Sequence, residues 1–352
     1  MSISLTPPAP GPTTADRGAL TLVAPISGVL VPLDAVPDPA FAQRLAGDGV
    51  SIDPLSDVVV APCDAVVRLV HRAGHAVTIE AFGLEIVIHI GLDTVALRGE
   101  GFHPVVKNGD SVRAGDPLLR FDIDLVARRA RSLLTEMLIT NMDVVSALRP
   151  RSGRVVGGRD VVLEVSLNEQ RPAAAPTGNQ AGEAATADMV RSAPIVVAAE
   201  TGLHARPAAV VAATARRFAA DVRLVKDGRE ANARSVVSIM KSAGAVVAAP
   251  PVSTPKTVSP AVTVTPGHRA RAAALAAALG GNDNIESVEV VAITRLRVAL
   301  GDEGRIDERA LERAGAGGVM RVSDRVVHVI VGEDAAGLAA AMATGVAPAT
   351  VR

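Results

Sequence analysis

The chain has 352 residues, a length that predicts roughly two or three domains. Its 36 basic and 37 acidic residues nearly cancel, which disfavours nucleic acid or an anionic membrane as the main partner. The single cysteine, Cys63, excludes an intramolecular disulfide framework and suggests a reducing compartment. The sequence shows neither a secretion signal nor an uncharged apolar run of the ~18–20 residues that span a bilayer. We therefore expect a cytoplasmic protein that is not membrane-spanning.

Residues 1–18 are rich in Pro and Thr and predict a flexible tail. The next segment, 19–167, consists of short apolar runs with period-two alternation, separated by Gly, Pro and Asp. This pattern is typical of an all-β antiparallel sandwich or barrel. One short helix is expected within it, at 125–134. A polar, Pro/Ala/Gly-rich stretch at 168–190 then predicts a linker.

Mixed helices and strands follow the linker and predict two small α+β domains. In the first, 191–279, we expect strands at 194–200 and 221–227, helices at 205–219, 235–243 and 269–279, and an irregular Pro-rich stretch at 250–266. The second, 280–346, begins at a Gly-Gly-Asn break and ends before a tail at 347–352. Here we expect strands at 288–300, 318–323 and 325–332 and helices at 307–315 and 335–344.

Two histidines of the first domain are expected to face each other across a β-hairpin. If 81–83 is a three-residue loop, Glu80 pairs with Leu84, and His75 then pairs with His89. Directly opposed residues have Cβ atoms about 4.5–5.5 Å apart, so the two imidazoles could meet. A bulge or a longer loop would shift this register by one residue.

An imidazole pair of this kind suits phosphoryl transfer. A neutral imidazole, with a reference pKa of about 6.5, is a good nucleophile near neutral pH, and its attack on phosphorus gives a phosphoimidazole. The second imidazole can hydrogen-bond the phosphoryl oxygens. Two alternatives remain open: the histidines have no role, or His75 and His89 bind zinc with a third ligand such as His71 or His103.

Several motifs of the first domain closely resemble the glucose-family enzyme IIA domain of the bacterial sugar phosphotransferase system. They are GDGVSIDP at 47–54, His75, IHIGLDTV at 88–95, GEGF at 99–102 and TNMD at 140–143. The resemblance implies that His89 carries the phosphoryl group and that His75 is its partner. It also implies supporting roles for three further residues of the active face, namely Asp48, Asp93 and Thr94.

A second candidate site is His204, in the string GLHARPA just before an expected helix. The free N–H groups and dipole of a helix start favour negative charge, and Arg206 could donate a charge-assisted hydrogen bond to a phosphoryl group. An ordinary capped helix beside an exposed histidine is the alternative. The string resembles the phosphorylation motif of the histidine phosphocarrier HPr. This resemblance implies that His204 is phosphorylated and that Arg206 stabilises the phosphate.

Ser235 matches the serine that begins a short helix in the HPr family, where some bacteria phosphorylate it. It is therefore a candidate regulatory residue. A plain helix cap is an equally good interpretation of a serine at this position.

The last domain resembles the enzyme IIB domain of the glucose family through GGNDNI at 280–285 and AITRLRV at 292–298. The family's phosphorylated cysteine immediately precedes ITRLR, and here that residue is Ala292. The resemblance therefore implies an EIIB-like domain without its nucleophile. Arg295 and Arg297 share one strand face and could bind an anion, or could be solvated surface residues.

Together these resemblances imply a multi-domain phosphoryl carrier that needs no metal, nucleotide or other cofactor. Enzyme I would phosphorylate His204, which would pass the group to His89 and on to a cysteine of a membrane sugar permease of the EIIB/EIIC type. The implied sugars are of the glucose or N-acetylglucosamine type. The alternative is a phosphorylation-dependent regulatory protein that binds permeases or kinases, with the EIIB-like domain as a docking module.

Overall fold

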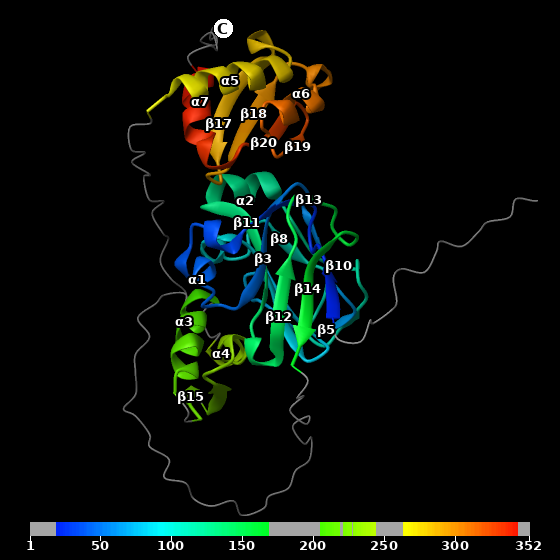
Figure 1. Cartoon of the computed structure of the whole chain (residues 1–352), viewed down its shortest axis with the longest axis vertical. Helices are drawn as coiled ribbons and strands as arrows, with labels where there is room; N and C mark the ends of the chain where they lie inside the picture. The colour runs from blue at the N-terminus through cyan, green and yellow to red at the C-terminus, as the bar shows by residue number, and fades with distance from the viewer. Residues whose placement is uncertain (1–18, 169–204, 219–220, 227, 244–262, 344–352) are drawn as a thin grey trace, which may run out of the picture.

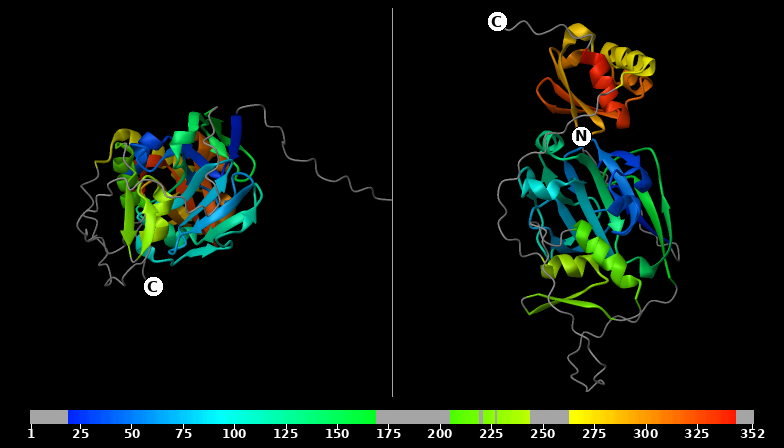
Figure 2. Two further views of the ribbon diagram at one scale, coloured as in Figure 1. Left: turned by 90° about the horizontal axis from the view of Figure 1, so that it is seen from below. Right: turned by 90° about the vertical axis from the view of Figure 1, so that its left-hand side faces the viewer.

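A computed structural model of the chain describes residues 19–168, 205–218, 221–226, 228–243 and 263–343. We call 19–168 the N-terminal region, 205–243 the middle region and 263–343 the C-terminal region. The N-terminal region lies between the other two, with the C-terminal region at one end of the long axis and the middle region toward the other (Figures 1 and 2). The sequence expectations for the tail at 1–18, the linker at 168–190 from Glu169 onward, the strand at 194–200 and the tail at 347–352 fall on residues outside this description.

The N-terminal region is built from antiparallel sheets, as the sequence predicted. An eight-stranded sheet has the order β13-β2-β3-β11-β7-β6-β5-β9, and two three-stranded sheets have the orders β1-β14-β12 and β4-β10-β8. The strands are β1 Ala19–Val23, β2 Gly28–Val31, β3 Asp48–Pro54, β4 Val58–Val60, β5 Ala65–Val70, β6 Ala76–Ala81, β7 Leu84–Leu92, β8 Phe102–Pro104, β9 Ser111–Val112, β10 Pro117–Phe121, β11 Ser132–Ile139, β12 Val145–Pro150, β13 Arg154–Val155 and β14 Val161–Leu167.

Apolar side chains from all three sheets form one core, which includes Leu22, Ile79, Ile88, Leu119 and Val165. Two short helices border it, α1 (Pro39–Ala42) and α2 (Ile123–Arg129). Each begins at an aspartate whose carboxylate accepts a backbone N–H of the first turn, and α1 also has proline at its first position. Both are standard helix-start signals.

The described part of the middle region contains two helices and a two-stranded sheet. These are α3 (Ala205–Arg216), β15 (Arg223–Lys226), β16 (Arg229–Asn232) and α4 (Val236–Ala243). Gly228, with φ of 75°, stands in the turn between β15 and β16, where a left-handed backbone favours glycine. The two helices pack against each other and toward the N-terminal region.

The C-terminal region is a four-stranded antiparallel sheet of order β17-β18-β20-β19, with helices α5 and α7 packed on one face. Its elements are α5 Pro266–Ala278, β17 Ile285–Val291, β18 Arg295–Leu300, α6 Glu308–Arg313, β19 Gly318–Ser323, β20 Val326–Ile330 and α7 Ala335–Ala343. The single strand expected at 288–300 is wrong. The chain reverses at Ala292 and Ile293, whose φ values are 50° and 52°, so that β17 and β18 form a hairpin.

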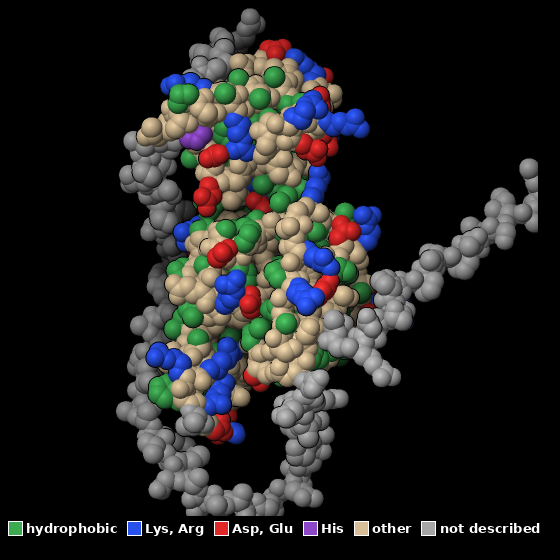
Figure 3. Space-filling model, viewed as in Figure 1, with side chains coloured by type: hydrophobic (Ala, Val, Ile, Leu, Met, Phe, Trp, Pro, Cys, Tyr) green, Lys and Arg blue, Asp and Glu red, His purple; other side chains and the backbone are tan. Residues whose placement is uncertain are grey.

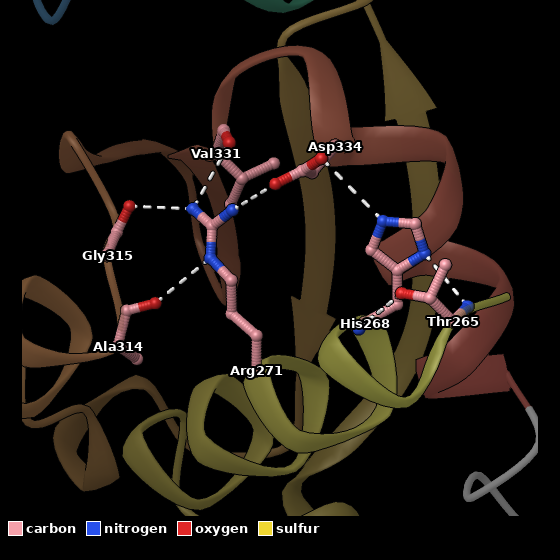
Figure 4. Close-up of polar contacts among 7 residues, drawn as sticks. All are labelled: Thr265, His268, Arg271, Ala314, Gly315, Val331 and Asp334. Carbon is pink, nitrogen blue, oxygen red and sulfur yellow. Dashed lines mark hydrogen bonds and ion pairs between the residues drawn. The ribbon is translucent and has the colours of Figure 1, made fainter.

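Helix α5 belongs to the C-terminal region and not to the middle region, so the domain boundary that we predicted between residues 279 and 280 is wrong. Leu275 and Leu279 lie in the core of the C-terminal region with Leu338. Arg271 fixes the helix further, because its guanidinium donates to the carbonyls of Ala314, Gly315 and Val331 and pairs with Asp334 at 2.7 Å (Figure 4). At the start of the helix, Thr265 and His268 form reciprocal capping hydrogen bonds. An Ala-rich helix carries little information about its partner, which explains the error.

Acidic and basic side chains are interspersed over the face shown in Figure 3. None of the helices in the described residues is long and apolar enough to cross a membrane.

Candidate active site

His89 lies in the middle of the eight-stranded sheet, on β7 between β11 and β6. Almost every residue of β7 is buried. A strand covered on both faces has a nearly continuous apolar run instead of a clean alternation, as LEIVIHI shows. The His89 side chain keeps 9% exposure, so part of it remains within reach of solvent.

His75 precedes β6 by one residue, and its ring meets that of His89. The ring centroids are 5.0 Å apart and the planes are nearly perpendicular, at 83°. The carbonyl oxygen of His75 accepts the backbone N–H of Ile90 at 2.9 Å, which ties the two histidine-bearing segments together. The predicted meeting of the two imidazoles is therefore present in the structure.

The register that we predicted for this hairpin is wrong by one residue. The turn has two residues, Phe82 and Gly83, both with positive φ, so Ala81 pairs with Leu84 and Ala76 stands opposite His89. Two-residue turns with positive φ match the twist of a hairpin, and glycine at the second position is typical of them. His75 still reaches His89 because it lies just before β6, after a turn at Gly74 with φ of 68°. Its side chain is therefore not bound to the alternation of faces within that strand.

Aromatic rings surround the pair. Phe41 from α1 lies 5.5 Å from His89, and Phe102 lies 6.2 Å from His75, both measured between ring centroids. A third imidazole, that of His71, lies 4.4 Å from His75. Packing against these neighbouring rings restricts the rotation of both imidazoles.

Glu136 is a site residue that our sequence analysis missed. It lies on β11 directly opposite His89, and its Oε2 is 3.5 Å from Nδ1 of His89. Its side chain is completely buried. The available signal was a charged residue in the middle of the apolar strand SLLTEMLI, since buried glutamates are rare unless they are paired.

The loop after His89 is shaped by Gly91 and held by Thr94. Gly91 has φ of 68°, and a Cβ there would stand 2.7 Å from the carbonyl oxygen of Ser132 and from Cγ2 of Thr94. The buried Thr94 hydroxyl donates to the carbonyl of Ile90 at 2.7 Å. Asp93 is exposed on this loop, with a left-handed backbone at φ of 62°. Thr94 therefore supports the strand that carries His89.

Asp48 begins β3, two strands from β7, and faces Arg44 with a 3.0 Å ion pair. Its carboxylate also accepts the backbone N–H of Gly49 at 2.8 Å. Its contacts are thus with its own strand and with the turn before it.

Helices α3 and α4 pack over this part of the N-terminal region. One cluster of buried apolar side chains joins the two regions, and it contains Phe41, the neighbour of His89. Its other buried members are Leu33, Val36, Ala46, Leu92, Leu134 and Leu138 from the N-terminal region and Ala208, Ala209, Ala212, Val236, Ile239 and Met240 from the middle region. The start of α3 is therefore held on the side of the sheet that Phe41 covers.

Polar contacts accompany this apolar cluster. Nη2 of Arg216 donates to the carbonyl of Thr140 at 2.9 Å, and burial lowers the pKa of this arginine. The hydroxyl of Ser235 lies 3.3 Å from Oε2 of Glu85. A cavity of about 540 Å³ lies beside these contacts, lined by polar residues of both regions, among them Glu85, Asp143, Arg216 and Arg234.

The predicted phosphorylation site of the middle region is only partly within the description. His204 lies outside the described residues, and α3 begins at the next residue, Ala205. Arg206 is in the first turn of α3, with its side chain outside the description. Ser235 accepts the backbone N–H of Ser238 at 3.1 Å, so it caps α4 as the plainer interpretation expected.

Arg295 and Arg297 both contact carboxylates of the N-terminal region. Arg295 is fully buried and pairs with Asp53, and Nε of Arg297 lies 2.8 Å from Oδ1 of Asp124. Nε2 of His328, another residue missed in the sequence, lies 2.9 Å from the same Asp124 oxygen. The two arginines therefore bind anionic groups within this chain, and neither is a solvated surface residue.

Burial and neighbouring groups shift the pKa values of His328 and Asp124. Burial lowers the pKa of His328 to about 4, helped by the positive charge of Arg295, although Asp124 opposes the shift. Burial raises the pKa of Asp124, but hydrogen bonds from Arg297 and His328 outweigh it and leave that pKa lowered. At neutral pH, His328 is thus an uncharged donor to an ionised carboxylate.

Ala292 occupies the β17–β18 turn and is buried against the core of the N-terminal region. Cys63 lies elsewhere, within that core, and burial raises the pKa of its thiol to about 12, so it stays protonated and unreactive. Among the described residues, no group of three His, Cys, Asp or Glu side chains is placed to hold a metal ion. The zinc alternative thus lacks its third ligand there.

Three family descriptions match separate parts of the chain. Residues 20–145 match the EIIA 1 family of the phosphoenolpyruvate-dependent sugar phosphotransferase system. Residues 191–245 match the PTS HPr component phosphorylation site, and residues 273–307 match phosphotransferase system EIIB. The EIIB match begins inside α5, in agreement with the packing of that helix.

Similar curated proteins align with the N-terminal part of the chain. The glucose-specific EIIA component of Oceanobacillus iheyensis is 45% identical over 42% of this chain and 90% of its own length. That of Haemophilus influenzae is 41% identical over 40% of this chain and 86% of its own length. An N-acetylglucosamine-specific EIICBA component of Klebsiella pneumoniae is 42% identical over 41% of this chain and 23% of its own length. The solved glucose permease IIA of Mycoplasma capricolum is 35% identical, with 43% of this chain and 99% of that chain covered and a TM-score of 0.41.

Proposed function

We propose that this chain, which belongs to the glucose-type EIIA family of the phosphoenolpyruvate-dependent sugar phosphotransferase system and carries HPr and EIIB parts as well, relays phosphoryl groups from His204 to His89. The observation that carries the proposal is the apolar cluster that holds α3 and α4 over Phe41, which itself contacts the ring of His89. Because His204 directly precedes α3, this packing keeps donor and acceptor domains together. Holding two reacting groups in one assembly replaces a bimolecular encounter with an internal step.

In the proposed transfer, the lone pair of His89 Nε2 attacks phosphorus. Nδ1 is the nitrogen that faces Glu136, which leaves Nε2 for the reaction. A new P–N bond forms at Nε2 while the P–N bond at His204 breaks, and its electron pair returns to the imidazole of His204. No electrons are gained or lost overall, so transfer needs no redox partner. His75, 5.0 Å away between ring centroids, is suited to donate a hydrogen bond to the phosphoryl oxygens.

The steps before and after this transfer involve other proteins. Phosphorylated enzyme I would load His204, with Arg206 stabilising the phosphoryl group at the start of the helix. His89 would then deliver the group to a cysteine of a membrane sugar permease, because Ala292 has no nucleophilic atom. Glucose and N-acetylglucosamine are the sugars that the names of the relatives suggest. The relay would operate in the cytoplasm.

The experiment is to incubate the full chain with enzyme I and phosphoenolpyruvate and to map phosphohistidine by mass spectrometry without acid treatment. The proposal expects phosphoryl groups on His204 and His89 and none in residues 280–352. A purified permease EIIB domain should then remove the group from His89. A phosphoryl group found only in the C-terminal region would contradict the proposal.

A regulatory binding protein is the second candidate, favoured by the contacts of Arg295 and Arg297 with the N-terminal region. Such buried contacts suit an EIIB-like domain that has become a fixed docking module. The two candidates differ in turnover. A carrier passes phosphate to the permease many times, whereas a regulator accepts it and releases it slowly.

A further inference from the structure

Glu136 is fully buried inside a sheet, where a glutamate side chain is rare. It stands in the middle strand of the sheet, β11, with Ser51 of β3 opposite it on one side and His89 of β7 opposite it on the other. Directly opposed residues in an antiparallel pair project from the same face, so Ser51, Glu136 and His89 form one row. All three side chains are buried.

Apolar side chains flank Glu136 on its own strand. Leu134 and Leu138, two residues before and after Glu136 on the same strand, belong to the cluster that joins the N-terminal and middle regions. A carboxylate buried in such surroundings costs several kcal/mol unless a charge or hydrogen bonds compensate for it. The polar groups that the sheet places across from Glu136 are the Ser51 hydroxyl and Nδ1 of His89, the latter at 3.5 Å.

We propose that Glu136 is a positioning residue for phosphoryl transfer, holding the proton of His89 on Nδ1 so that the lone pair of Nε2 faces the incoming phosphorus. The imidazole must keep its proton on one nitrogen to have a lone pair on the other. A carboxylate beside Nδ1 selects that tautomer and fixes the rotation of the ring. This inference rests on the proposed function for its kinetic consequence, but its effect on the tautomer stands by itself.

Glu136 also balances charge after transfer. Once phosphorus is bound to Nε2 and the proton remains on Nδ1, the ring carries a positive charge in a buried site. The described groups that face the ring include Glu136 from β11, His75 from the segment before β6 and the apolar ring of Phe41 from α1, with His71 behind His75. Glu136 is acidic and its Oε2 lies 3.5 Å from Nδ1, so it stabilises this charged state.

The test uses the full chain and three variants. Glu136→Met has similar volume, no charge and only a weak acceptor, Glu136→Gln keeps a good acceptor without charge, and Glu80→Gln is the matched control. Glu80 lies on β6, the strand beside β7, and its 40% exposed side chain pairs with Arg68 at 2.7 Å. Long-range proton–nitrogen NMR of histidine reports the tautomer of His89, and single-turnover labelling reports its rate of phosphorylation.

We expect the Nδ1–H tautomer of His89 in the wild type and in Glu80→Gln, and a shift toward the other tautomer in Glu136→Met. The rate should fall by about 10- to 100-fold in Glu136→Met, the effect known for losing a group that orients a metal-binding histidine, and Glu136→Gln should restore part of it. Loss of a glutamate with a purely structural role would change the free energy of unfolding and leave the tautomer of His89 as it is. A purely structural glutamate would therefore not produce this pattern.

Wild-type tautomer and rate in Glu136→Met would overturn the proposal. If that variant does not fold, Glu136→Gln decides, since an unchanged rate without the charge would also overturn it. If His89 shows the Glu136-dependent tautomer but never accepts phosphate in any variant, the inference about the tautomer holds and the proposed function fails.

Discussion

Arg295 and Asp53, 242 residues apart in the sequence, form a buried ion pair between the C-terminal and N-terminal regions. Nε of Arg295 lies 3.1 Å from Oδ1 of Asp53, and Nη2 contacts the same oxygen and the carbonyl of Pro54. Both side chains are nearly inaccessible to solvent. The contact joins a strand of the EIIB-like sheet to the end of β3.

Breaking this pair from one side should destabilise the protein strongly. We expect Asp53→Leu to lower the free energy of unfolding by about 3–5 kcal/mol, because it leaves a buried guanidinium without its carboxylate. The double variant Asp53→Leu/Arg295→Met should recover most of the loss. Urea unfolding of the full chain measures both. A double variant as unstable as the single one would argue against a buried pair.

An exposed pair in the same region supplies the control. Arg325 lies 3.6 Å from Glu286, and both side chains are more than half exposed. We expect Arg325→Ala to change the free energy of unfolding by only about 0–1 kcal/mol.

Acidification should weaken the C-terminal region through His328. Its pKa is about 4 in the folded protein and about 6.5 in an unfolded chain, so the unfolded state binds the proton first as pH falls. The contribution of uncharged His328 to the free energy of unfolding is therefore fully present well above pH 6.5. It is lost as the pH falls toward 4, by about 2 kcal/mol between pH 7.5 and 5. The neighbouring charges are Asp124, Arg297 and Arg295. Urea unfolding at several pH values, with His328→Gln as the comparison, should show this slope in the wild type and a smaller one in the variant.

Arg216 should be required for docking of the middle region. Removing its hydrogen bond to the Thr140 carbonyl should cost roughly 1.5–3 kcal/mol of the free energy that holds the middle region on the N-terminal region. We expect Arg216→Ala to slow internal transfer from His204 to His89 by about 10- to 100-fold, as that energy loss implies. Rapid-quench measurement of the label on each histidine tests this. Both Arg216 and the neighbouring Arg217 are exposed, but only Arg216 of the two has side-chain hydrogen bonds among the described residues. Arg217→Ala should therefore transfer at the wild-type rate, and equal rates for the two variants would refute the role of Arg216.

A negative charge at Ser235 should weaken the same contact. The Ser235 hydroxyl lies 3.3 Å from a Glu85 carboxylate oxygen, so a carboxylate or phosphate there would face a like charge. We expect Ser235→Asp to slow internal transfer while α4 stays capped, because aspartate is a good helix cap. Adding Glu85→Gln should restore part of the rate. Slow transfer that Glu85→Gln does not relieve would point to a different cause.

The sequence predicted the meeting of His75 and His89 but not its geometry. Period-two alternation and the Ala-Phe-Gly turn located the hairpin, whereas the choice between a two- and a three-residue loop depends on backbone torsions at Phe82 and Gly83. The error left the pair intact because His75 lies outside the strand. The prediction of a single strand at 288–300 was wrong for a similar reason, since Ala292 and Ile293 turn the chain without a glycine or proline.

Contacts between distant segments could not be predicted from local patterns. Glu136 lies beside His89 only because β11 is inserted between β3 and β7, an order that no periodicity reveals. The same holds for Asp53 and Asp124, whose partners Arg295 and Arg297 lie 242 and 173 residues further along the chain. Helix α5 was assigned to the wrong domain because its alanines fit many neighbours. Motifs located the histidines, and topology supplied the groups around them.

The most direct test of the relay follows radiolabelled phosphate from phosphoenolpyruvate through enzyme I into the full chain, His204→Ala and His89→Ala. The account predicts label on both histidines in the wild type and on His204 alone in His89→Ala. In His204→Ala, His89 should stay unlabelled until separate HPr is added. Label that reaches His89 in His204→Ala without any HPr would contradict the internal transfer.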